Sequence, residues 1–395
     1  MPPRSRSGSR ADGAAMTWSP PVREDLRGAS PYGAPQLDVP VRLNTNENPF
    51  PLSPALAERM GHAVAEAAQA LNRYPDREAW ALREDLAAYL LRESGVTVDA
   101  SMLWPANGSN EVMQHIFSAF GGPGRLAMGF SPTYSMYEQY ARDTFTRYRT
   151  VGRRPDFGLD AAMVVAAMIG GSPDIVILTS PNNPTGTALT LDVVSAACAM
   201  SSGIVVVDEA YAEFRRPGTP TALTLLEAHP NLVVTRTMSK AFAMAGARVG
   251  YAVANSAIVD ALRLVRLPYH LSSVTQAVAR AALASSEELL GQVDLLRAER
   301  DALVAWLRAS GVRAVDSDAN FILVGEFTDR HRAWQALLDR GVLIREVGPE
   351  GWLRVTVGTP EDNEAFRAAL AEVIAMDGMM VPPAEGDGST DGGTA

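Results

Sequence analysis

The chain has 395 residues, 47% of them hydrophobic and 20% charged, a composition that predicts a soluble protein with one or two domains and a large core. Its formal net charge of −10 argues against a general nucleic-acid-binding protein, and no apolar run reaches the length of a membrane-spanning helix. The only cysteine, Cys198, excludes an intramolecular disulfide framework and a cysteine-rich zinc site, and five histidines without ligand spacing predict no metal site.

The first ordered elements are predicted to be helices. Ser53-Pro54 is typical of an N-cap followed by proline at the first helical position, and it begins a predicted helix that runs to about Leu71. Apolar residues at helical spacing then continue to a stop at Gly95. The sequence WPANGSN (104–110) indicates the end of a strand followed by a helix that opens at Gly108.

The middle of the chain predicts an α/β fold. Four apolar runs are candidates for buried strands, at 125–130, 174–180, 203–210 and 231–237. Helical patterns separate most of them, near 133–142, 160–170 and 190–201. Apolar strands that alternate with helices indicate a parallel sheet covered on both faces. Such a sheet binds ligands beyond the carboxyl ends of its strands, so polar motifs that follow the runs are candidate site residues.

The pattern changes after about Val265 and predicts a smaller α+β domain. A long helical region (273–309) leads to short apolar runs, a helix near 330–340 and a final helix over about 360–375. The polar ends, rich in Gly, Pro and Ser, predict disorder. We therefore expect a disordered extension over 1–28, an arm over 29–45 that belongs with the small domain, a large domain over 46–270, a small domain over 271–380 and a disordered tail over 381–395.

Lysine is nearly absent from the chain. Lys240 is the only one among 35 basic residues, so the other 34 are arginines. Arginine can replace lysine on a solvated surface, but arginine stays protonated, whereas a lysine amine can lose its proton and act as a nucleophile. We therefore expect Lys240, which follows the apolar run 231–237, to carry chemistry that needs a primary amine.

The residues around Lys240 suit a phosphorylated aldehyde. Thr237 and Ser239 precede it, and Arg248 lies eight residues after it. Hydroxyl groups and a guanidinium can bind a phosphate, and a lysine amine forms a Schiff base with an aldehyde. An aldehyde and a phosphate together describe pyridoxal 5′-phosphate, a cofactor that serves as an electron sink.

Three further motifs follow predicted strands and agree with this cofactor. Asp208, at the end of a buried strand, can keep the pyridine nitrogen protonated, and Tyr211 can bind the ring hydroxyl. Asn183, in SPNNPTG, can aim its amide at the same ring oxygen. Ser109 and Asn110 begin a predicted helix, and N–H groups at a helix N-terminus bind phosphate.

Taken together, these motifs resemble those of a known family. The chain is similar to the fold-type I pyridoxal-phosphate aminotransferases, and within them to the histidinol-phosphate aminotransferases, from about residue 27 to about residue 375. SPNNPTG, DEAY and SKAF with its later arginine carry the resemblance to the superfamily, while LNTNENP, NGSNE and PYHLSSVTQ point to the narrower family. The resemblance implies a large domain on a mainly parallel sheet and a smaller α+β domain.

The resemblance also implies a role for each matching residue. Lys240 would form the imine with the cofactor and move the proton, and Asp208 would pair with the pyridinium nitrogen. Asn183 and Tyr211 would contact the ring hydroxyl. The cofactor phosphate would be held by Ser109, Asn110, Thr237, Ser239 and Arg248. Tyr134, in SPTYSMY, would stack on the cofactor ring. Tyr74, in RYPD, would reach the cofactor phosphate of the neighbouring subunit, which implies a homodimer with shared active sites.

Substrate binding is expected from two arginines and a tyrosine. Arg354 matches the arginine that grips the substrate carboxylate in the superfamily, and Arg345 and Tyr32 would add contacts for a doubly charged phosphate. The implied reaction, in the cytoplasm, is a transamination between L-histidinol phosphate and 2-oxoglutarate. It gives imidazole-acetol phosphate and L-glutamate, a step of histidine biosynthesis.

Three alternatives stay open at this point. An aromatic amino-acid aminotransferase could use the same scaffold, because an imidazole and a phenyl ring differ little in shape. A decarboxylase of a phosphorylated amino acid could share the fold and the phosphate recognition. A non-catalytic binding protein of the same fold would need no Schiff-base lysine, so the retained Lys240 argues against it.

Overall fold

The computed structural model describes residues 18–381 in two compact units, one ending at Gly33 and the other beginning at Ala34. The first unit contains η1 (Glu24–Leu26), a turn of 3-10 helix within the stretch for which disorder is expected. Most of the two ends with expected disorder, residues 1–17 and 382–395, lies outside the described residues. The domain boundaries stay predictions.

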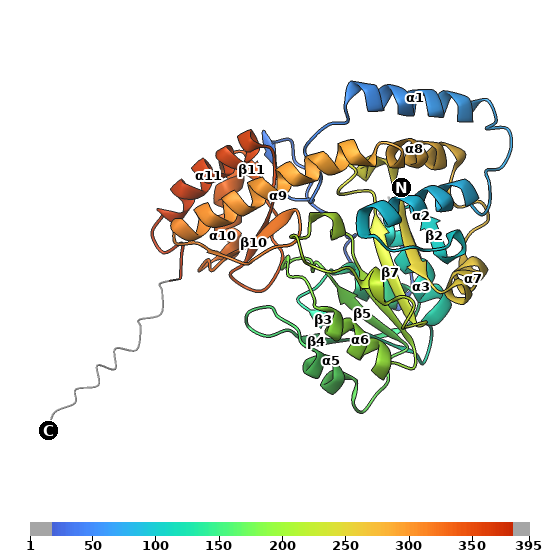
Figure 1. The fold of residues 1–395 in the computed structure, drawn as a ribbon. Coiled ribbons are helices and arrows are strands. Elements are labelled where there is room, and N and C mark those ends of the chain that lie inside the picture. The colour runs from blue at the N-terminus through green and yellow to red at the C-terminus, as the bar shows by residue number, and fades with distance from the viewer. Residues whose placement is uncertain (1–17, 382–395) are drawn as a thin grey trace, which may run out of the picture. The chain divides into compact units, whose positions relative to one another are not determined.

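The second unit is built on a seven-stranded sheet with the strand order β2-β8-β7-β6-β5-β3-β4 (Figure 1). Its strands are β2 (Leu103–Ala106), β3 (Leu126–Ser131), β4 (Arg147–Gly152), β5 (Ile175–Thr179), β6 (Ile204–Asp208), β7 (Leu232–Thr237) and β8 (Gly250–Ala254). Neighbours from β4 to β7 are parallel, whereas β8 is antiparallel to both β7 and β2. The prediction of an α/β fold with a mainly parallel sheet is confirmed.

Helices cover both faces of this sheet. One face packs against α3 (Ser109–Phe120), α4 (Met136–Asp143) and α7 (Ser256–Val265). The other packs against α2 (Trp80–Ser94), α5 (Ala161–Met168), α6 (Leu191–Met200) and α8 (Ser273–Leu283), and α1 (Pro54–Ala68) packs on α8. Ile175 and Ile177 of β5 face the first set of helices, and Val176 and Leu178 face the second. The strand is apolar throughout because both of its faces are buried.

The structure differs from the expected elements in two places. The strands β4 and β8 lie outside the predicted apolar runs; β4 is an edge strand with the sequence RYRTVG, in which polar residues interrupt the apolar signal. The predicted helical region 273–309 consists of two helices, α8 and α9 (Ser286–Ala309). Two consecutive serines, Ser285 and Ser286, stand at the break, and serine hydroxyls compete for the backbone hydrogen bonds of a helix.

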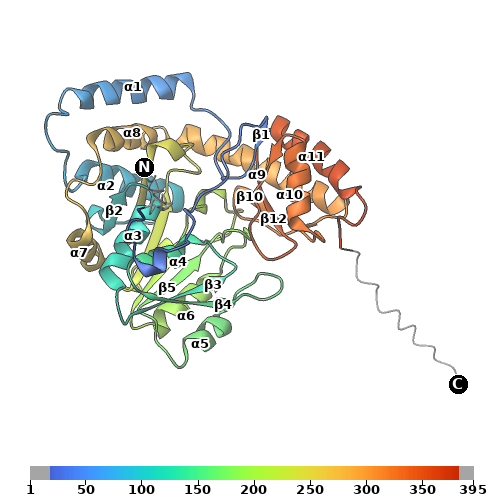
Figure 2. The same ribbon diagram turned by 180° about the vertical axis from the view of Figure 1, so that it is seen from behind.

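The C-terminal elements contain a second, antiparallel sheet. Its strands, in the order β12-β10-β9, are β12 (Leu353–Thr356), β10 (Phe321–Gly325) and β9 (Arg313–Ala314). Beside it lie α9, α10 (Arg330–Asp339) and α11 (Pro360–Ile374) (Figure 2). The short strand β1 (Val41–Arg42) pairs in parallel with β11 (Val342–Leu343). The chain just before residue 45 is therefore tied to these C-terminal elements.

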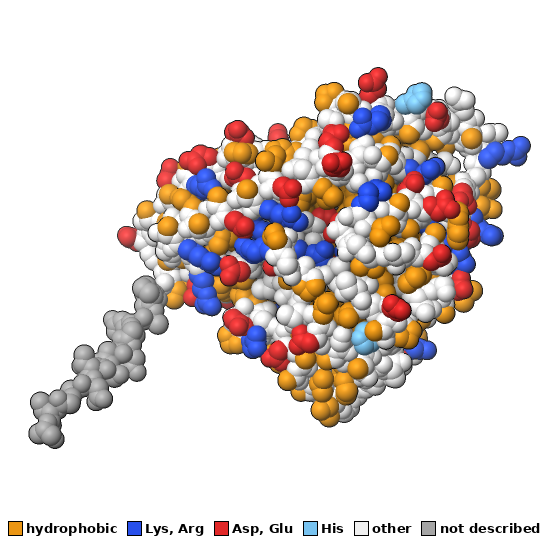
Figure 3. Space-filling view, viewed as in Figure 1, with side chains coloured by type: hydrophobic (Ala, Val, Ile, Leu, Met, Phe, Trp, Pro, Cys, Tyr) orange, Lys and Arg blue, Asp and Glu red, His pale blue; other side chains and the backbone are white. Residues whose placement is uncertain are grey.

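The surface seen in Figure 3 carries acidic and basic side chains interspersed with apolar ones. Across residues 18–381, no helix is long and apolar enough to cross a membrane.

The carboxyl ends of β5, β6 and β7 meet at one edge of the large sheet. The strand register places Thr179 beside Asp208, and Asp208 beside Thr235. Because β8 runs in the opposite direction, its first residue, Gly250, lies beside Thr237 at the same edge. The polar motifs follow these strands, so this edge positions the candidate site.

Candidate active site

Lys240 follows β7 by three residues and is held by the backbone of a distant segment. Its Nζ donates a hydrogen bond of 3.0 Å to the carbonyl oxygen of Thr45. The pKa of this amine is lowered to about 8, first by burial and then by the charges of Arg354 and Arg248, while Glu47 acts in the opposite direction. The environment therefore increases the fraction of neutral amine, which is the form that attacks an aldehyde.

Donor groups gather around the N-terminus of α3. Arg248 Nη1 donates to Ser239 Oγ at 3.3 Å, and Thr237 Oγ1 donates to the same oxygen at 3.0 Å. Within residues 18–381, no side chain caps the first turn of α3, whose N-cap residue is Gly108. Uncapped backbone N–H groups beside a guanidinium and two hydroxyls suit a phosphate dianion.

Two glycines allow these groups to approach one another. At Gly108, where φ is +86°, an added Cβ would lie 2.6 Å from Arg248 Nη2. At Gly250, an added Cβ would overlap the backbone nitrogen of Ser109, so β8 passes directly against the start of α3. Only glycine leaves room for this arrangement. The structure thus brings together five of the predicted phosphate residues: Ser109, Asn110, Thr237, Ser239 and Arg248.

Asp208 is buried at the end of β6 and accepts three hydrogen bonds. Tyr137 Oη donates to Oδ2 at 2.7 Å, while the backbone N–H of Ala210 and Thr235 Oγ1 donate to Oδ1 at 3.2 and 3.3 Å. Burial raises the pKa of Asp208, and these hydrogen bonds oppose the rise. A buried carboxylate of this kind binds a cationic N–H group strongly, which is the role expected toward a pyridinium nitrogen.

Asn183 and Arg354 are joined directly, and both side chains are buried. Arg354 Nη1 donates to Asn183 Oδ1 at 2.6 Å, and Nη2 donates to the backbone carbonyl of Asn44 at 2.8 Å. Because the amide oxygen of Asn183 accepts from Arg354, its Nδ2 group points elsewhere as a donor. This orientation is compatible with the contact predicted between Asn183 and a cofactor ring oxygen.

Arg345 lies opposite Arg354 in an antiparallel β-bridge. Each backbone N–H donates to the other residue's carbonyl oxygen at 2.9 Å. Residues paired in this way project their side chains to the same face. Arg354 is buried with its guanidinium 5.2 Å from the Phe321 ring centroid, and Arg345 is half-buried. Two guanidinium groups on one face favour a ligand with two negative charges.

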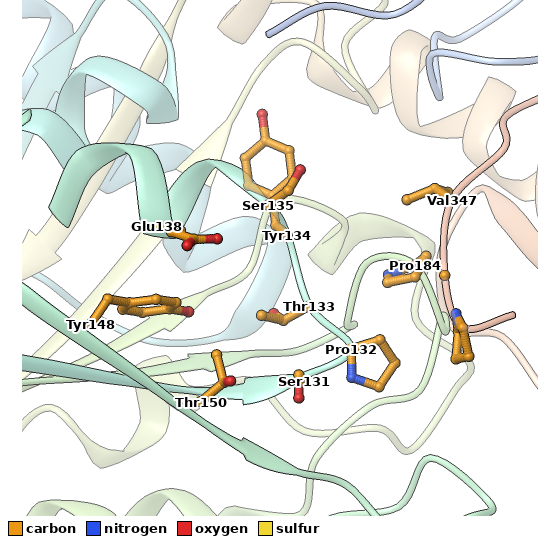
Figure 4. Close-up of a pocket in the computed structure, with 12 residues that line it drawn as sticks. Ser131, Pro132, Thr133, Tyr134, Ser135, Glu138, Tyr148, Thr150, Pro184 and Val347 are labelled. Carbon is orange, nitrogen blue, oxygen red and sulfur yellow. The ribbon is translucent and has the colours of Figure 1, made fainter. Parts of the chain in front are cut away.

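A cavity of about 510 Å³ borders this region at the ends of β3 and β4 (Figure 4). Tyr134 lines it on the segment after β3, and Val347 lines it on the segment that follows Arg345. The ring of Tyr134 packs edge-on against Tyr137, with 5.6 Å between ring centroids. Since Tyr137 binds Asp208, Tyr134 lies beside the predicted cofactor residues, and the cavity extends from Tyr134 to Pro184 and Val347.

Tyr211 is buried and packs edge-on against Phe321, with 5.0 Å between ring centroids. Its hydroxyl accepts a hydrogen bond of 3.0 Å from Asn46 Nδ2. Tyr211 thus joins the group of predicted residues that the fold assembles at this edge.

One predicted residue of the second unit, Tyr74, is not part of this assembly, and another, Tyr32, belongs to the first unit. Tyr74 is 79% exposed and stacks on Tyr269, with ring centroids 4.3 Å apart. Tyr32 lies in the first unit, so its predicted role is not tested by the geometry of the second.

Sequence reasoning missed two contributors to the site. The segment 44–46 touches three predicted residues in succession: Arg354 through the carbonyl of Asn44, Lys240 through that of Thr45, and Tyr211 through the amide of Asn46. The segment belongs to the motif LNTNENP, which marked the family without a residue role. Tyr137, the second tyrosine of SPTYSMY, is the other, and its place three residues after Tyr134 was the only signal.

The reverse face of the same strand ends is held by buried ion pairs. Arg236, between Thr235 and Thr237, lies 2.8 Å from Glu209 and 2.9 Å from Glu93. Alternate residues of a strand face opposite sides, so these pairs join β7 to the segment after β6 and to α2 without entering the site.

The chain matches the family described as aminotransferase class I and II over residues 39–370. It is 63% identical to the histidinol-phosphate aminotransferase of Thermobifida fusca over 350 residues, which cover 89% of this chain and 94% of that protein. It is 60% identical to histidinol-phosphate aminotransferase 3 of Burkholderia lata over 357 residues, which cover 90% and 96%.

A solved structure agrees with these relatives. The histidinol-phosphate aminotransferase from Sinorhizobium meliloti, in complex with pyridoxal 5′-phosphate, superposes with a TM-score of 0.75 at 26% identity, covering 85% of this chain and 91% of that one. The resemblance inferred from the motifs is confirmed. The chain belongs to the class I and II aminotransferases, in the group formed by the histidinol-phosphate aminotransferases.

Proposed function

We propose that this protein is a pyridoxal-phosphate-dependent histidinol-phosphate aminotransferase. It transfers the amino group of L-glutamate to imidazole-acetol phosphate, giving 2-oxoglutarate and L-histidinol phosphate in histidine biosynthesis. The observation that carries the proposal is the pairing of Arg345 with Arg354 on one face, in a chain whose relatives at about 60% identity are named for this substrate.

Each substrate presents an anion to the paired arginines. The carboxylate of glutamate and the phosphate of histidinol phosphate bind at Arg354 in turn. Arg345 adds a second guanidinium, which suits the dianionic phosphate better than a single carboxylate. Tyr32 is a further proposed contact for the phosphate.

The residues at the sheet edge fit pyridoxal phosphate. The uncapped start of α3 beside Arg248, and the glycine that leaves space next to that guanidinium, form a cradle for a phosphate. The buried carboxylate of Asp208 suits the ring nitrogen. Pyridoxal phosphate supplies an aldehyde that captures an amine and a ring that withdraws electrons from the substrate carbon.

Each of these side chains has a separate proposed role in the reaction. Lys240 Nζ would hold the cofactor through its aldehyde, and as a free amine, whose pKa its surroundings lower, it would accept the proton of the amine-bearing substrate carbon and return it. Asp208, whose carboxylate accepts a hydrogen bond from the hydroxyl of Tyr137, would hold the proton on the ring nitrogen. Asn183 and Tyr211 would donate to the ring oxygen, and Tyr134 would stack on the ring.

Steady-state kinetics with 2-oxoglutarate as acceptor test the proposal. We expect kcat/KM for histidinol phosphate to exceed that for phenylalanine and for tyrosine by about 100-fold or more. Lys240→Ala is expected to lose at least about 10³-fold in turnover. Higher efficiency on phenylalanine would identify an aromatic aminotransferase, and carbon dioxide release without a keto acid would identify a decarboxylase.

A homodimer with shared sites is part of the proposal. Tyr74 is 79% exposed, and Tyr269, Leu264 and Leu267 are also exposed, the leucines by 86% and 74%. An exposed apolar group of this kind favours contact with a second copy of the chain, where Tyr74 would reach the cofactor phosphate.

The single cysteine, a buried thiol, is compatible with the cytoplasmic location proposed for the enzyme.

Mixing two inactive variants tests the shared site. In a heterodimer of Tyr74→Ala and Lys240→Ala subunits, one site has both residues intact and the other has neither. Random reassembly of equal amounts makes about half of the dimers heterodimers, each with one working site of two. The mixture is therefore expected to recover about a quarter of the unmodified activity. No recovery, in a mixture shown to exchange subunits, would place Tyr74 outside the neighbouring site.

A further inference from the structure

We infer that Asn46 is a positioning residue that makes Tyr211 a hydrogen-bond donor toward the cofactor ring oxygen. The inference rests on the proposed role of Tyr211, and it assigns a function to the segment 44–46, which the proposed reaction does not use.

Asn46 is buried and its backbone is fixed from two sides. Its φ is +54°, in the left-handed region, and its relative exposure is 1%. Non-glycine residues seldom adopt this conformation, although asparagine does so more readily than most. The backbone N–H donates to Thr356 Oγ1 at 3.0 Å, and the carbonyl oxygen accepts from Asn320 Nδ2 at 3.1 Å. The side-chain amide is therefore presented in a defined direction.

The hydrogen bonds around Asn46 identify the donor at each step. Thr356 Oγ1 accepts from the backbone N–H of Asn46, so it uses its own proton to donate to Asn46 Oδ1 at 3.1 Å. The amide oxygen consequently faces Thr356, and Nδ2 donates to Tyr211 Oη at 3.0 Å. A phenol that accepts this bond has its own proton for a different acceptor. With the cofactor bound, the ring oxygen is that acceptor.

The same segment joins Tyr211 to the strand that binds the substrate anion. Arg354 and Thr356 lie two residues apart on β12, so their side chains face the same side. Arg354 bonds to the carbonyl of Asn44, and Thr356 bonds to Asn46. The direction of the Tyr211 hydroxyl is therefore set from the strand that carries Arg354.

The visible absorbance of bound pyridoxal phosphate reports on this contact. A hydrogen bond donated to the ring oxygen draws electron density from it. The oxygen then binds less tightly the proton on the adjacent nitrogen, through which Lys240 holds the cofactor. Weakening the donor raises the pH at which that proton leaves. The probe is the midpoint of the pH-dependent absorbance change in protein loaded with pyridoxal phosphate.

Two substitutions of Asn46 distinguish the effect of its side-chain amide from the effect of its backbone conformation. Asn46→Gly keeps a left-handed conformation, which glycine adopts freely, and removes the amide. We expect the midpoint to rise by about 0.5 pH units or more. Asn46→Asp keeps the size and the acceptor for Thr356 but offers Tyr211 a carboxylate that competes for its proton, so a larger rise is expected. Asn46→Asp decides the question if Asn46→Gly does not fold.

Two controls locate the effect. Ala79→Gly places glycine at another left-handed position, with φ +49° at the N-cap of α2, and is expected to leave the midpoint unchanged. In a Tyr211→Phe background, Asn46→Gly is expected to add less than about 0.2 pH units, because the hydroxyl it orients is gone.

The outcomes distinguish this inference from the proposed function. An unchanged midpoint in both Asn46 variants, or an equal shift with and without the Tyr211 hydroxyl, would overturn the inference alone, since the cofactor is still bound. Failure of the unmodified chain to bind pyridoxal phosphate would overturn the proposed function and this inference with it.

Discussion

Arg354 Nη1 donates a hydrogen bond of 2.6 Å to Asn183 Oδ1, across 171 positions of the sequence. The bond joins the strand that carries the proposed anion-binding arginine to the loop that carries the proposed ring contact. A hydrogen bond from a charged donor is short and geometrically specific. In the proposed roles, the two ends of this one buried pair would recognise the substrate anion and the cofactor ring.

Arg354→Lys is expected to lower kcat/KM for both glutamate and histidinol phosphate by about 10- to 100-fold. An ammonium group has no planar fork, so it cannot bond Asn183, the carbonyl of Asn44 and a substrate anion in the present geometry. Steady-state kinetics in both directions check the expectation. A loss confined to one substrate would contradict a shared anion site.

Arg345→Gln is expected to distinguish the phosphate from a carboxylate. Removing the second guanidinium should lower kcat/KM for histidinol phosphate by about 10- to 100-fold, because a hydrogen bond to a charged group is lost. Efficiency with phenylalanine, which carries a single carboxylate, should stay within about threefold. Equal losses on the two substrates would show that Arg345 does not select the phosphate.

Tyr137→Phe is expected to shift the pH profile of the enzyme. Burial raises the pKa of Asp208 and the hydrogen bond from Tyr137 opposes that rise, so removing the hydroxyl raises the pKa further. Asp208 acts as a carboxylate, and activity is lost as the pH falls through its pKa. The acidic limb of the kcat profile should therefore move up by about one pH unit.

Tyr251→Phe is the matched control for this shift. The hydroxyl of Tyr251 is also buried, and it has no hydrogen-bond partner among the described residues. Its removal should leave the acidic limb in place. A similar displacement in both variants would point to a general effect of losing a buried hydroxyl.

Gly250→Ala is expected to weaken cofactor binding. The added methyl group overlaps the backbone at the start of α3, so it displaces the N–H groups proposed to bind the phosphate. Overpacking of this kind should raise the dissociation constant for pyridoxal phosphate by roughly tenfold or more, as measured by equilibrium dialysis. Gly291→Ala, where nothing lies within 4 Å of the added atom, should bind the cofactor normally.

Labelling with pyridoxal phosphate and borohydride is expected to modify one side chain, Lys240, besides the α-amino group. Since burial and the neighbouring arginines lower the pKa of Lys240 from 10.5 to about 8, the labelling rate of cofactor-free protein should rise with pH to a midpoint near 8. At pH 7 about one amine in ten is neutral, against about one in three thousand at the ordinary pKa. Mass spectrometry of the labelled peptide checks the site, and a midpoint near 10.5 would contradict the shifted pKa.

Much of the fold could be predicted because most of its strands appear in the sequence as runs of consecutive apolar residues. The runs at 174–180 and 231–237 are apolar throughout, and a strand buried on both faces must be so. The edge strand β4 lacked that signal because its polar residues face solvent on one side. Lys240 could be singled out from composition alone, because the reaction needs an amine that none of the 34 arginines provides.

The sequence by itself thus determined most of the strands of the large sheet, the sheet edge and the chemistry expected of Lys240, all of which depend on residue type and on near neighbours in the chain. Only the tertiary structure decided the contacts of Asn46. This residue meets Tyr211 across 165 positions and Thr356 across 310. No pattern along the chain encodes such distances, because these side chains become neighbours only when packing brings β12 and the segment 44–46 to the end of β6.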